Sequence, residues 1–152
     1  MTAIESSTEE SGGTVLHGTV LYIEDEPINV SLVEAIIQQR HPGVRLVHAA
    51  TGAEGVQLVR SEKPDFVLLD MHLPDMSGLE VVRQLNVDIA NRGLRVTILT
   101  GDSLSMDIIK AMSLGAYEYW VKPLDLKLFE AGLRRALTGR RPDPARRLPS
   151  RA

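Results

Sequence analysis

Acidic, hydroxyl and amine side chains stand at the ends of short apolar runs along this sequence of 152 residues. They are the acids Glu24, Asp25 and Glu26 after TVLYI, Asp70 at the end of DFVLLD, Thr100 at the end of RVTILT, and Lys122 after YEYWV. A carboxylate at the edge of an apolar core costs free energy unless something there uses its charge. Crowded carboxylates also repel one another, so a bound cation is the natural reason to keep them together. Oxygen ligands without sulfur favour Mg²⁺.

Asp70 is the candidate nucleophile, because a carboxylate can attack a phosphoryl donor and form an acyl phosphate. Phosphoryl transfer depends on positioning and on neutralising the phosphoryl oxygens rather than on further covalent chemistry. A metal ion, the Lys122 ammonium and the Thr100 hydroxyl could provide both. The pattern therefore predicts a site that accepts a phosphoryl group on Asp70.

The elements that would position these groups are indicated by the pattern of the chain. Short apolar, β-branched runs alternate with segments of helical period, which is typical of a parallel sheet with helices on its faces. The expected strands span 19–23, 44–49, 65–70, 95–100 and 117–121. The expected helices span about 27–39, 52–62, 78–87, a fourth from its N-cap Ser103 to Leu114-Gly115, and 125–138.

This order predicts an α/β fold, a single doubly wound, flavodoxin-like domain with five helices and a parallel sheet in the order 2-1-3-4-5. In such a sheet, ligands bind beyond the carboxyl ends of the strands, where the groups named above would meet. The first helix opens at Pro27 and places Ile28, Leu32 and Ile36 on one apolar stripe.

The length fits one compact domain, expected at 18–138, between a polar tail at 1–17 and a Pro/Arg-rich tail at 139–152. With 43% hydrophobic and 24% charged residues, the composition is that of a soluble globular protein without a membrane span. The net charge of -3 gives no reason to expect direct nucleic-acid binding. The sequence has no cysteine, which excludes disulfides, and starts without a secretory pattern, so we expect the cytoplasm.

Four motifs, in this order, resemble those of a known family, the receiver domain of two-component response regulators. They are VLYIEDEP with the acidic pair Glu24-Asp25, LLDMHLPDMSG with Asp70, ILTG with Thr100, and GAYEYWVKP with Tyr119 and Lys122-Pro123. Each motif alone is weakly specific, but all four in this order at the ends of the first, third, fourth and fifth expected strands are highly specific. The resemblance covers about residues 18–138.

The resemblance implies a metal site at the ends of the first and third strands. Asp25 and Asp70 would bind Mg²⁺ directly, together with the backbone carbonyl of His72, and Glu24 would act mostly through water. Glu24 stands where the family often has aspartate, but the acidic group is kept.

The resemblance also implies how the phosphoryl group would be sensed. Lys122 would pair with the phosphoryl oxygens, and Thr100 would move to hydrogen-bond the phosphate. Tyr119 would then turn inward behind it, whereas Trp120, on the other face of the strand, is expected in the core. Gly101 follows the threonine where alanine is commoner, and we expect it to loosen the next loop.

The function expected from this resemblance is a phosphorylation-dependent signalling switch. Asp70 would accept a phosphoryl group from a sensor histidine kinase or a histidine phosphotransfer protein, and the domain would dephosphorylate itself without acting as an enzyme on another substrate. About 14 residues follow the last helix, so we expect no output domain in this chain and a protein partner downstream. The expected contact face, also a candidate homodimer face, comprises the fourth helix, fifth strand and fifth helix and includes Ile108, Met112, Tyr119 and Leu133.

Three other interpretations remain open. The chain could be the receiver of a hybrid sensor kinase or of a larger regulator, since its polar start and Pro/Arg-rich end would suit linkers. An aspartyl-phosphate phosphatase would normally carry a second aspartate two residues after the nucleophile, where this sequence has His72. A flavin-binding protein would need a Ser/Thr/Gly-rich phosphate loop after the first strand, and the segment EDEPIN is acidic there.

Overall fold

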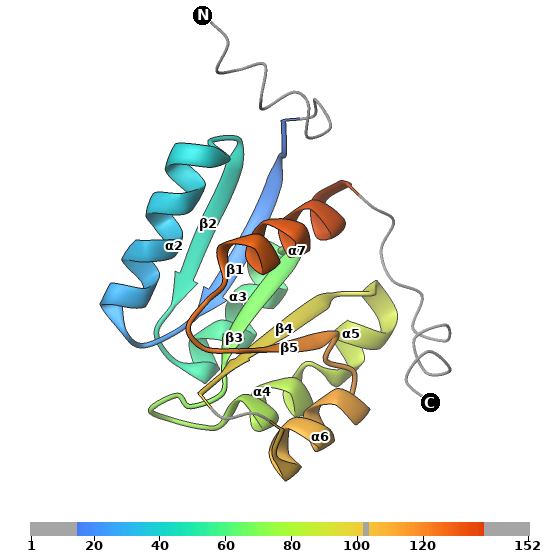
Figure 1. Ribbon diagram of the computed structural model, residues 1–152. Coiled ribbons are helices and arrows are strands. Elements are labelled where there is room, and N and C mark those ends of the chain that lie inside the picture. The colour runs from blue at the N-terminus through green and yellow to red at the C-terminus, as the bar shows by residue number, and fades with distance from the viewer. Residues whose placement is uncertain (1–14, 102–103, 139–152) are drawn as a thin grey trace, which may run out of the picture.

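The computed structural model describes residues 15–101 and 104–138, and the element labels follow Figure 1. Within these ranges the strands are β1 (Gly18–Ile23), β2 (Val44–Ala49), β3 (Phe66–Asp70), β4 (Arg95–Thr100) and β5 (Glu118–Val121). The helices are α2 (Pro27–Arg40), α3 (Gly52–Glu62), α4 (Gly78–Gln84), α5 (Asn86–Arg92), α6 (Met106–Ser113) and α7 (Leu126–Thr138). Strands and helices alternate as predicted, except that both α4 and α5 follow β3.

The five strands form one parallel sheet in the order β2-β1-β3-β4-β5, which confirms the predicted topology. The central strand β3 is buried along its whole length, as expected for the unbroken apolar run before Asp70. Ile23 of β1 lies beside Leu69 of β3, and Asp70 lies beside Leu99 of β4. Because all the strands run in the same direction, their carboxyl ends meet at one edge of the sheet (Figure 1).

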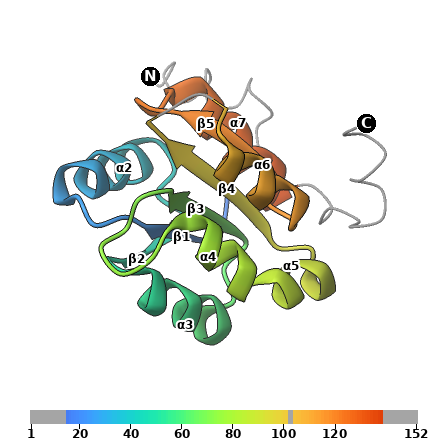
Figure 2. The ribbon, with the colours of Figure 1, turned by 90° about the horizontal axis from the view of Figure 1, so that it is seen from below.

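Helices cover both faces of the sheet (Figure 2). α2 and α7 lie on one face, over a buried cluster that includes Tyr22, Phe66 and Trp120. α3, α4, α5 and α6 lie on the other face, over a cluster that includes Leu21 and Ile23. Because successive residues of a strand point to opposite faces, β1 supplies apolar side chains to both clusters.

The apolar stripe noted on α2, Ile28, Leu32 and Ile36, is not the side of the helix that packs on the sheet. Ile28 is 78% exposed and Leu32 is 50% exposed, whereas Ile36 packs partly buried against the core. Both this set and the set that the helix buries have helical spacing, so periodicity alone could not tell which one faces the sheet. The buried residues of α2 are Val30, Val33 and Ile37.

The predicted third helix, 78–87, is divided in the structure. α4 ends at Gln84 and α5 begins at Asn86, so the described residues form six helices rather than the predicted five. Leu85, between the two helices, and Ile89 are both buried in the cluster on the α3 side of the sheet, and they anchor α5 there. α5 ends at Gly93, whose positive φ of 66° suits a glycine.

The N-cap of α6 is Ser105 rather than the predicted Ser103, which lies outside the described residues. The Ser105 hydroxyl oxygen accepts a hydrogen bond from the backbone N–H of Ile108 at 3.3 Å. α6 then ends at Ser113, directly before the Leu114-Gly115 pair that was expected to close it.

The predicted domain limits at 18 and 138 stay predictions, because most of the tails at 1–17 and 139–152 lies outside the described residues. Leu16, just before β1, is 3% exposed and packs in the cluster beneath α2 and α7. Among the residues that the structure describes, no helix combines the length and the apolar character needed to cross a bilayer.

Candidate functional site

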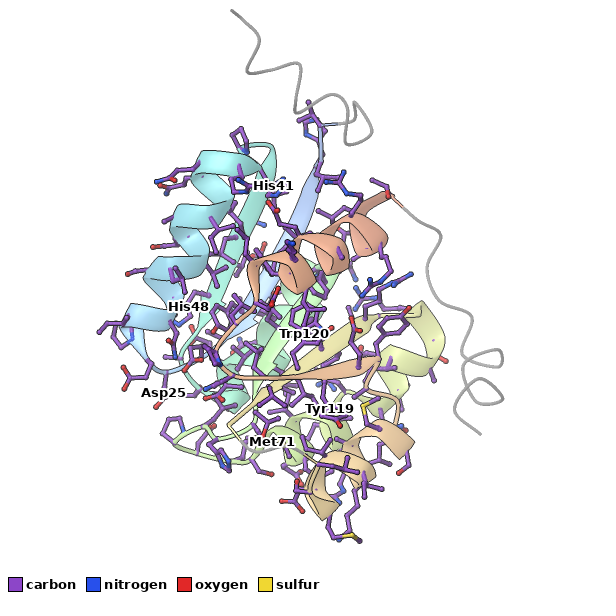
Figure 3. All side chains as sticks on the ribbon, viewed as in Figure 1. Asp25, His41, His48, Met71, Tyr119 and Trp120 are labelled. Carbon is purple, nitrogen blue, oxygen red and sulfur yellow. The ribbon has the colours of Figure 1, made fainter. Side chains whose placement is uncertain are left out.

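Three carboxylates gather at the carboxyl edge of the sheet, where Figure 3 labels Asp25. Glu24 follows β1 and is fully buried, Asp70 ends β3 and is also buried, and Asp25 is exposed. Each offers one oxygen, and these oxygens lie within 4.8 Å of one another, so the cluster could hold a metal ion. The parallel register brings them together, because Ile23 and Leu69, the residues just before Glu24 and Asp70, lie side by side.

Lys122 reaches this cluster from the end of β5. Its Nζ lies 2.9 Å from Asp70 Oδ1 and 3.9 Å from Glu24 Oε1. The contact with Asp70 is an ion pair without the alignment of a hydrogen bond. The Lys122 backbone N–H donates to the carbonyl oxygen of Thr100 at 2.7 Å, so the end of β4 helps to position this lysine.

Glu24 is held from two sides although it is buried. The Tyr22 hydroxyl donates to Glu24 Oε1 at 3.1 Å, and the Glu26 backbone N–H donates to Oε2 at 3.1 Å. Burial raises the pKa of Glu24 above its usual value, and the Asp70 carboxylate adds to the rise. The Glu26 N–H, the Lys122 ammonium and the Tyr22 hydroxyl lower this pKa without cancelling the effect of burial. Glu24 is thus a fixed acid whose charge is costly unless a cation lies nearby.

Tyr22 is a site residue that the sequence analysis missed. Burial raises the pKa of its hydroxyl, and the neighbouring Glu24 carboxylate raises it further, so the hydroxyl remains a hydrogen-bond donor. Strand alternation was the available signal, because residues i and i+2 project to the same side of a strand. Applied one residue past the end of β1, it would have placed Tyr22 beneath Glu24.

Thr100 and Tyr119 lie on adjoining strands. Thr100 ends β4, is 2% exposed and pairs with Val121 of β5. Tyr119 is half-buried and packs against the cluster on the α6 side of β5, whereas Trp120 lies on the α7 side (Figure 3). Trp120 is 5% exposed and meets the ring of Phe66 edge to face at 6.4 Å, which confirms its predicted place in the core.

His72 lies in the loop between β3 and α4, and its side chain is exposed. The loop closes on itself at its base, where the Gly78 N–H donates to the Met71 carbonyl oxygen at 2.7 Å and His72 pairs with Ser77 in an isolated antiparallel bridge. These contacts fix the loop backbone at His72, which follows Asp70 by two residues in the sequence. The role of the His72 carbonyl as a metal ligand stays a prediction.

Two of the residues predicted for the partner surface are wrong. Ile108 of α6 and Leu133 of α7 are both fully buried, because they lie on the sides of their helices that pack on the sheet. Met112 and Tyr119 are half-buried. The exposed apolar residues on α6, on β5, on α7 and just before α6 are Leu104, Met106, Ile109, Val121, Leu126 and Leu128.

A cleft of about 440 Å³ opens beside the acidic cluster, between α2 and the segment that follows β5. Lys122 lines it on the side of the site, and the exposed Leu32 of α2 lines it on the other. Its remaining lining residues are Tyr22, Asn29, Val33, Leu99, Gly101, Pro123 and Leu124.

The sequence that folds into this arrangement matches a described family. The model of the response regulator receiver domain matches residues 20–134. The chain belongs to this receiver domain family. Receiver domains are components of two-component systems, and the four sequence motifs now lie together at one edge of the receiver fold.

The chain spans about half the length of some curated relatives and most of the length of others. The chain is 35% identical over 109 residues to the probable transcriptional regulatory protein TcrX of Mycobacterium tuberculosis, an overlap of 72% of this chain but only 45% of TcrX. It is 32% identical over 106 residues to protein PilH of Pseudomonas aeruginosa, an overlap of 70% of this chain and 86% of PilH. It is 30% identical over 111 residues to the polar-differentiation response regulator DivK of Brucella anthropi, an overlap of 73% of this chain and 89% of DivK.

Solved receiver structures resemble this chain closely in fold. The receiver domain of the sensor histidine kinase PA1611 from Pseudomonas aeruginosa has a TM-score of 0.68 and 25% identity, with 79% of this chain and 97% of that chain covered. In that crystal structure a magnesium ion is coordinated in the active-site cleft. A response regulator of the LuxR family from Aurantimonas has a TM-score of 0.66 and 28% identity, with 89% and 97% covered.

Proposed function

We propose that this receiver domain accepts a phosphoryl group on Asp70 from a sensor histidine kinase or a histidine phosphotransfer protein, and that it signals through protein contacts. One observation carries the proposal. Asp70 is buried at the carboxyl edge of the sheet, within an acidic cluster, with the Lys122 ammonium 2.9 Å from its Oδ1. We expect this exchange in the cytoplasm, where ATP-dependent kinases obtain their phosphoryl groups.

The acidic cluster fits Mg²⁺, because it offers oxygen ligands of one charge from different elements. We propose that Asp25 and Asp70 hold the ion directly with the backbone carbonyl of His72, and that the buried Glu24 acts through water. When bound, Mg²⁺ supplies positive charge that offsets the crowded acids and neutralises the phosphoryl oxygens. The hydrogen bonds from Tyr22 and Glu26 support this role for Glu24, because they fix its carboxylate behind the exposed Asp25.

In the transfer step, an Asp70 carboxylate oxygen attacks the phosphorus of a phosphohistidine. The new O–P bond forms as the N–P bond breaks, and the electron pair of that bond stays on the donor imidazole. Lys122 leaves Asp70 Oδ1 and pairs with a phosphoryl oxygen, and the Thr100 hydroxyl donates to another. Attack of water on the acyl phosphate later releases inorganic phosphate and regenerates Asp70, so the domain is an acceptor that resets itself.

The donor has to approach Asp70 from outside the sheet, and the cleft beside Lys122 is the surface that supports such an approach. Its apolar lining from Leu32 and Leu124, together with the exposed Ile28, offers area that a helical donor can cover while its histidine reaches Asp70. Contact at this face also explains why α2 keeps large apolar side chains in water.

Output requires a second surface whose shape depends on phosphorylation. A ligand shifts a two-state equilibrium only through contacts that differ between the states, and the phosphate-dependent contacts of Lys122 and Thr100 are of this kind. Because Thr100 pairs with Val121, a change there reaches β5. The exposed apolar residues Leu104, Met106 and Ile109 lie just before and on α6, the helix that precedes β5 in the chain. We propose this face for a downstream protein or a second copy of the chain.

A second candidate is the receiver segment of a longer regulator or hybrid kinase. It is favoured by the relatives of which this chain spans only part, such as 45% of TcrX, and by the structural neighbour that is itself the receiver of a sensor kinase. The chemistry at Asp70 is the same in both cases, and only the route of the signal differs.

The proposal is tested by treating the protein with a small-molecule phosphodonor and Mg²⁺ and measuring its intact mass. We expect one added phosphoryl group in the wild type, none in Asp70→Asn and none in EDTA. Asp107→Asn, an exposed acid in the first turn of α6, is the matched control and should be labelled like the wild type. Equal labelling of Asp70→Asn would overturn the assignment of Asp70.

A further inference from the structure

The loop between β3 and α4 carries His72 at its start and Asp75 near its tip. Its base is closed by the hydrogen bond between the Gly78 N–H and the Met71 carbonyl oxygen, as described above. Its tip reaches across to another element, the N-terminus of α3. The chain thus ties a loop next to the phosphoacceptor to a helix that contributes no side chain to the acidic cluster.

The tie is made by both oxygens of the Asp75 carboxylate. Oδ1 accepts a hydrogen bond from the Gly52 backbone N–H at 2.8 Å, and Oδ2 accepts one from the Ala53 N–H at 2.9 Å. These hydrogen bonds lower the pKa of Asp75, so the group stays charged where the helix dipole favours an anion. The next amide of α3, that of Glu54, is capped by the side chain of Thr51 at 3.1 Å. The loop and Thr51 therefore share the capping of one helix end.

Close packing accompanies these hydrogen bonds. A Cβ atom placed on Gly52 would lie 2.5 Å from Cγ of Met76, so the Met76 side chain packs against α3 at Gly52 and would have to shift to admit a larger residue there. Both the charged contact of Asp75 and the apolar contact of Met76 thus fix the tip of the loop on the start of α3. His72 lies three residues before Asp75 on the same short loop.

We propose that Asp75 is a positioning residue for the metal site: by fastening the loop to α3, it holds the backbone carbonyl of His72 in place relative to Asp25 and Asp70. This inference rests on the proposed function, because it assigns Asp75 a part in the same Mg²⁺ site. A backbone ligand has no side-chain rotamer of its own, so its position depends on what holds the loop. Residues that orient ligands in this way commonly change metal affinity by about 10-fold or more when they are removed.

The test compares Asp75→Ala and Asp75→Asn with Thr51→Ala by calorimetric titration of Mg²⁺ into metal-free protein. Thr51→Ala is the matched control, because it removes a cap from the same helix end without releasing the loop. Both alanine variants should lower the melting temperature by about 4 °C, as expected for the loss of a helix cap. Only Asp75→Ala should bind Mg²⁺ about 10-fold more weakly. Asp75→Asn, which keeps one acceptor oxygen, should be intermediate.

Amide hydrogen exchange reports the tie itself without metal. The amides of Gly52 and Ala53 should exchange faster in Asp75→Ala than in the wild type, and that of Glu54 should exchange faster in Thr51→Ala. Wild-type Mg²⁺ affinity in Asp75→Ala, or an equal loss in Thr51→Ala, would overturn the inference and leave the proposed function intact. A wild-type protein that binds no Mg²⁺ would overturn the two together.

Discussion

Glu24 and Asp25 are neighbours in the sequence, yet Glu24 is fully buried and Asp25 is exposed. A buried carboxylate needs hydrogen-bond partners, and Glu24 has the Tyr22 hydroxyl and the Glu26 amide. Asp25 remains in water and can exchange a water molecule for an ion. The fold therefore gives two adjacent acids different surroundings, which suits the proposed division between a fixed charge at Glu24 and an accessible metal ligand at Asp25.

The buried acid predicts a pH dependence in metal-free protein. Because burial raises the pKa of Glu24, the folded state holds this proton more tightly than the unfolded chain does. Stability should therefore fall as the pH rises from the usual pKa of 4.5 through the raised value, and it should stay lower above that window. Glu24→Gln removes this loss, so its free energy of unfolding should exceed that of the wild type at pH 7 by more than at pH 4. Urea unfolding in EDTA at pH 4 and at pH 7 measures the free energy of unfolding of the two proteins.

Glu80→Gln is the control of opposite sign. Hydrogen bonds from Gln84 and Arg83 lower the pKa of Glu80, so its carboxylate favours the folded state at neutral pH and loses that effect as the pH falls. The variant should therefore be the less stable protein at pH 7, with a smaller difference at pH 4. If the free energies of unfolding of Glu24→Gln and the wild type differ by the same amount at both pH values, that result would contradict the assignment of a raised pKa to Glu24.

At the scale of elements, the sequence predicted the five strands and their order because their apolar runs are short, β-branched and separated by turn residues. It could not choose between the two apolar stripes of α2, which have the same spacing and differ only in what they pack against. It also missed the break at Leu85, where one long helix becomes two short ones without a glycine or proline to mark the change. In the site, Asp70 and Lys122 stood out by charge. Strand alternation could have found Tyr22, whereas the role of Asp75 depends on a tertiary contact with α3.

The pairing of β4 with β5 predicts a spectroscopic signal. Trp120 is the only tryptophan of the chain, lies one residue from Val121, and is buried next to Phe66. Beryllofluoride with Mg²⁺, which imitates the phosphoryl group, should alter its emission in the wild type. Thr100→Ala lacks the hydroxyl that we propose contacts the phosphoryl group, so this variant should respond much less. An equal response in the two proteins would show that Thr100 does not couple the site to β5.

At the scale of the whole molecule, we expect the crowded acids to link folding to the binding of the proposed Mg²⁺ ion. A ligand that binds only the folded state adds about 2.7 kcal/mol to the free energy of unfolding at 100 times its dissociation constant. In metal-free protein, removing one acid relieves repulsion that the Lys122 ammonium offsets only in part. The proposed Mg²⁺ site should therefore cost stability when empty and return it when an ion is bound.

Thermal melting with and without Mg²⁺ tests this linkage. In EDTA, Asp25→Ala should melt at or above the wild-type temperature, because Asp25 is exposed and has like-charged neighbours. Saturating Mg²⁺ should raise the melting temperature of the wild type by several degrees and that of Asp25→Ala far less. Asp107→Ala should keep the full response. A large loss of stability for Asp25→Ala in EDTA would argue that the acid is structural.

Tyr119 and Trp120 are consecutive residues of β5, and they pack into different halves of the interior. β5 is only four residues long and is an edge strand of the described sheet, where it pairs with β4. The strand separates two packed clusters, so a displacement that tightens the packing on the α6 side loosens the packing on the α7 side. A group that pulls on the end of this strand therefore has opposite effects on the packing on the α6 side and on the α7 side of the molecule.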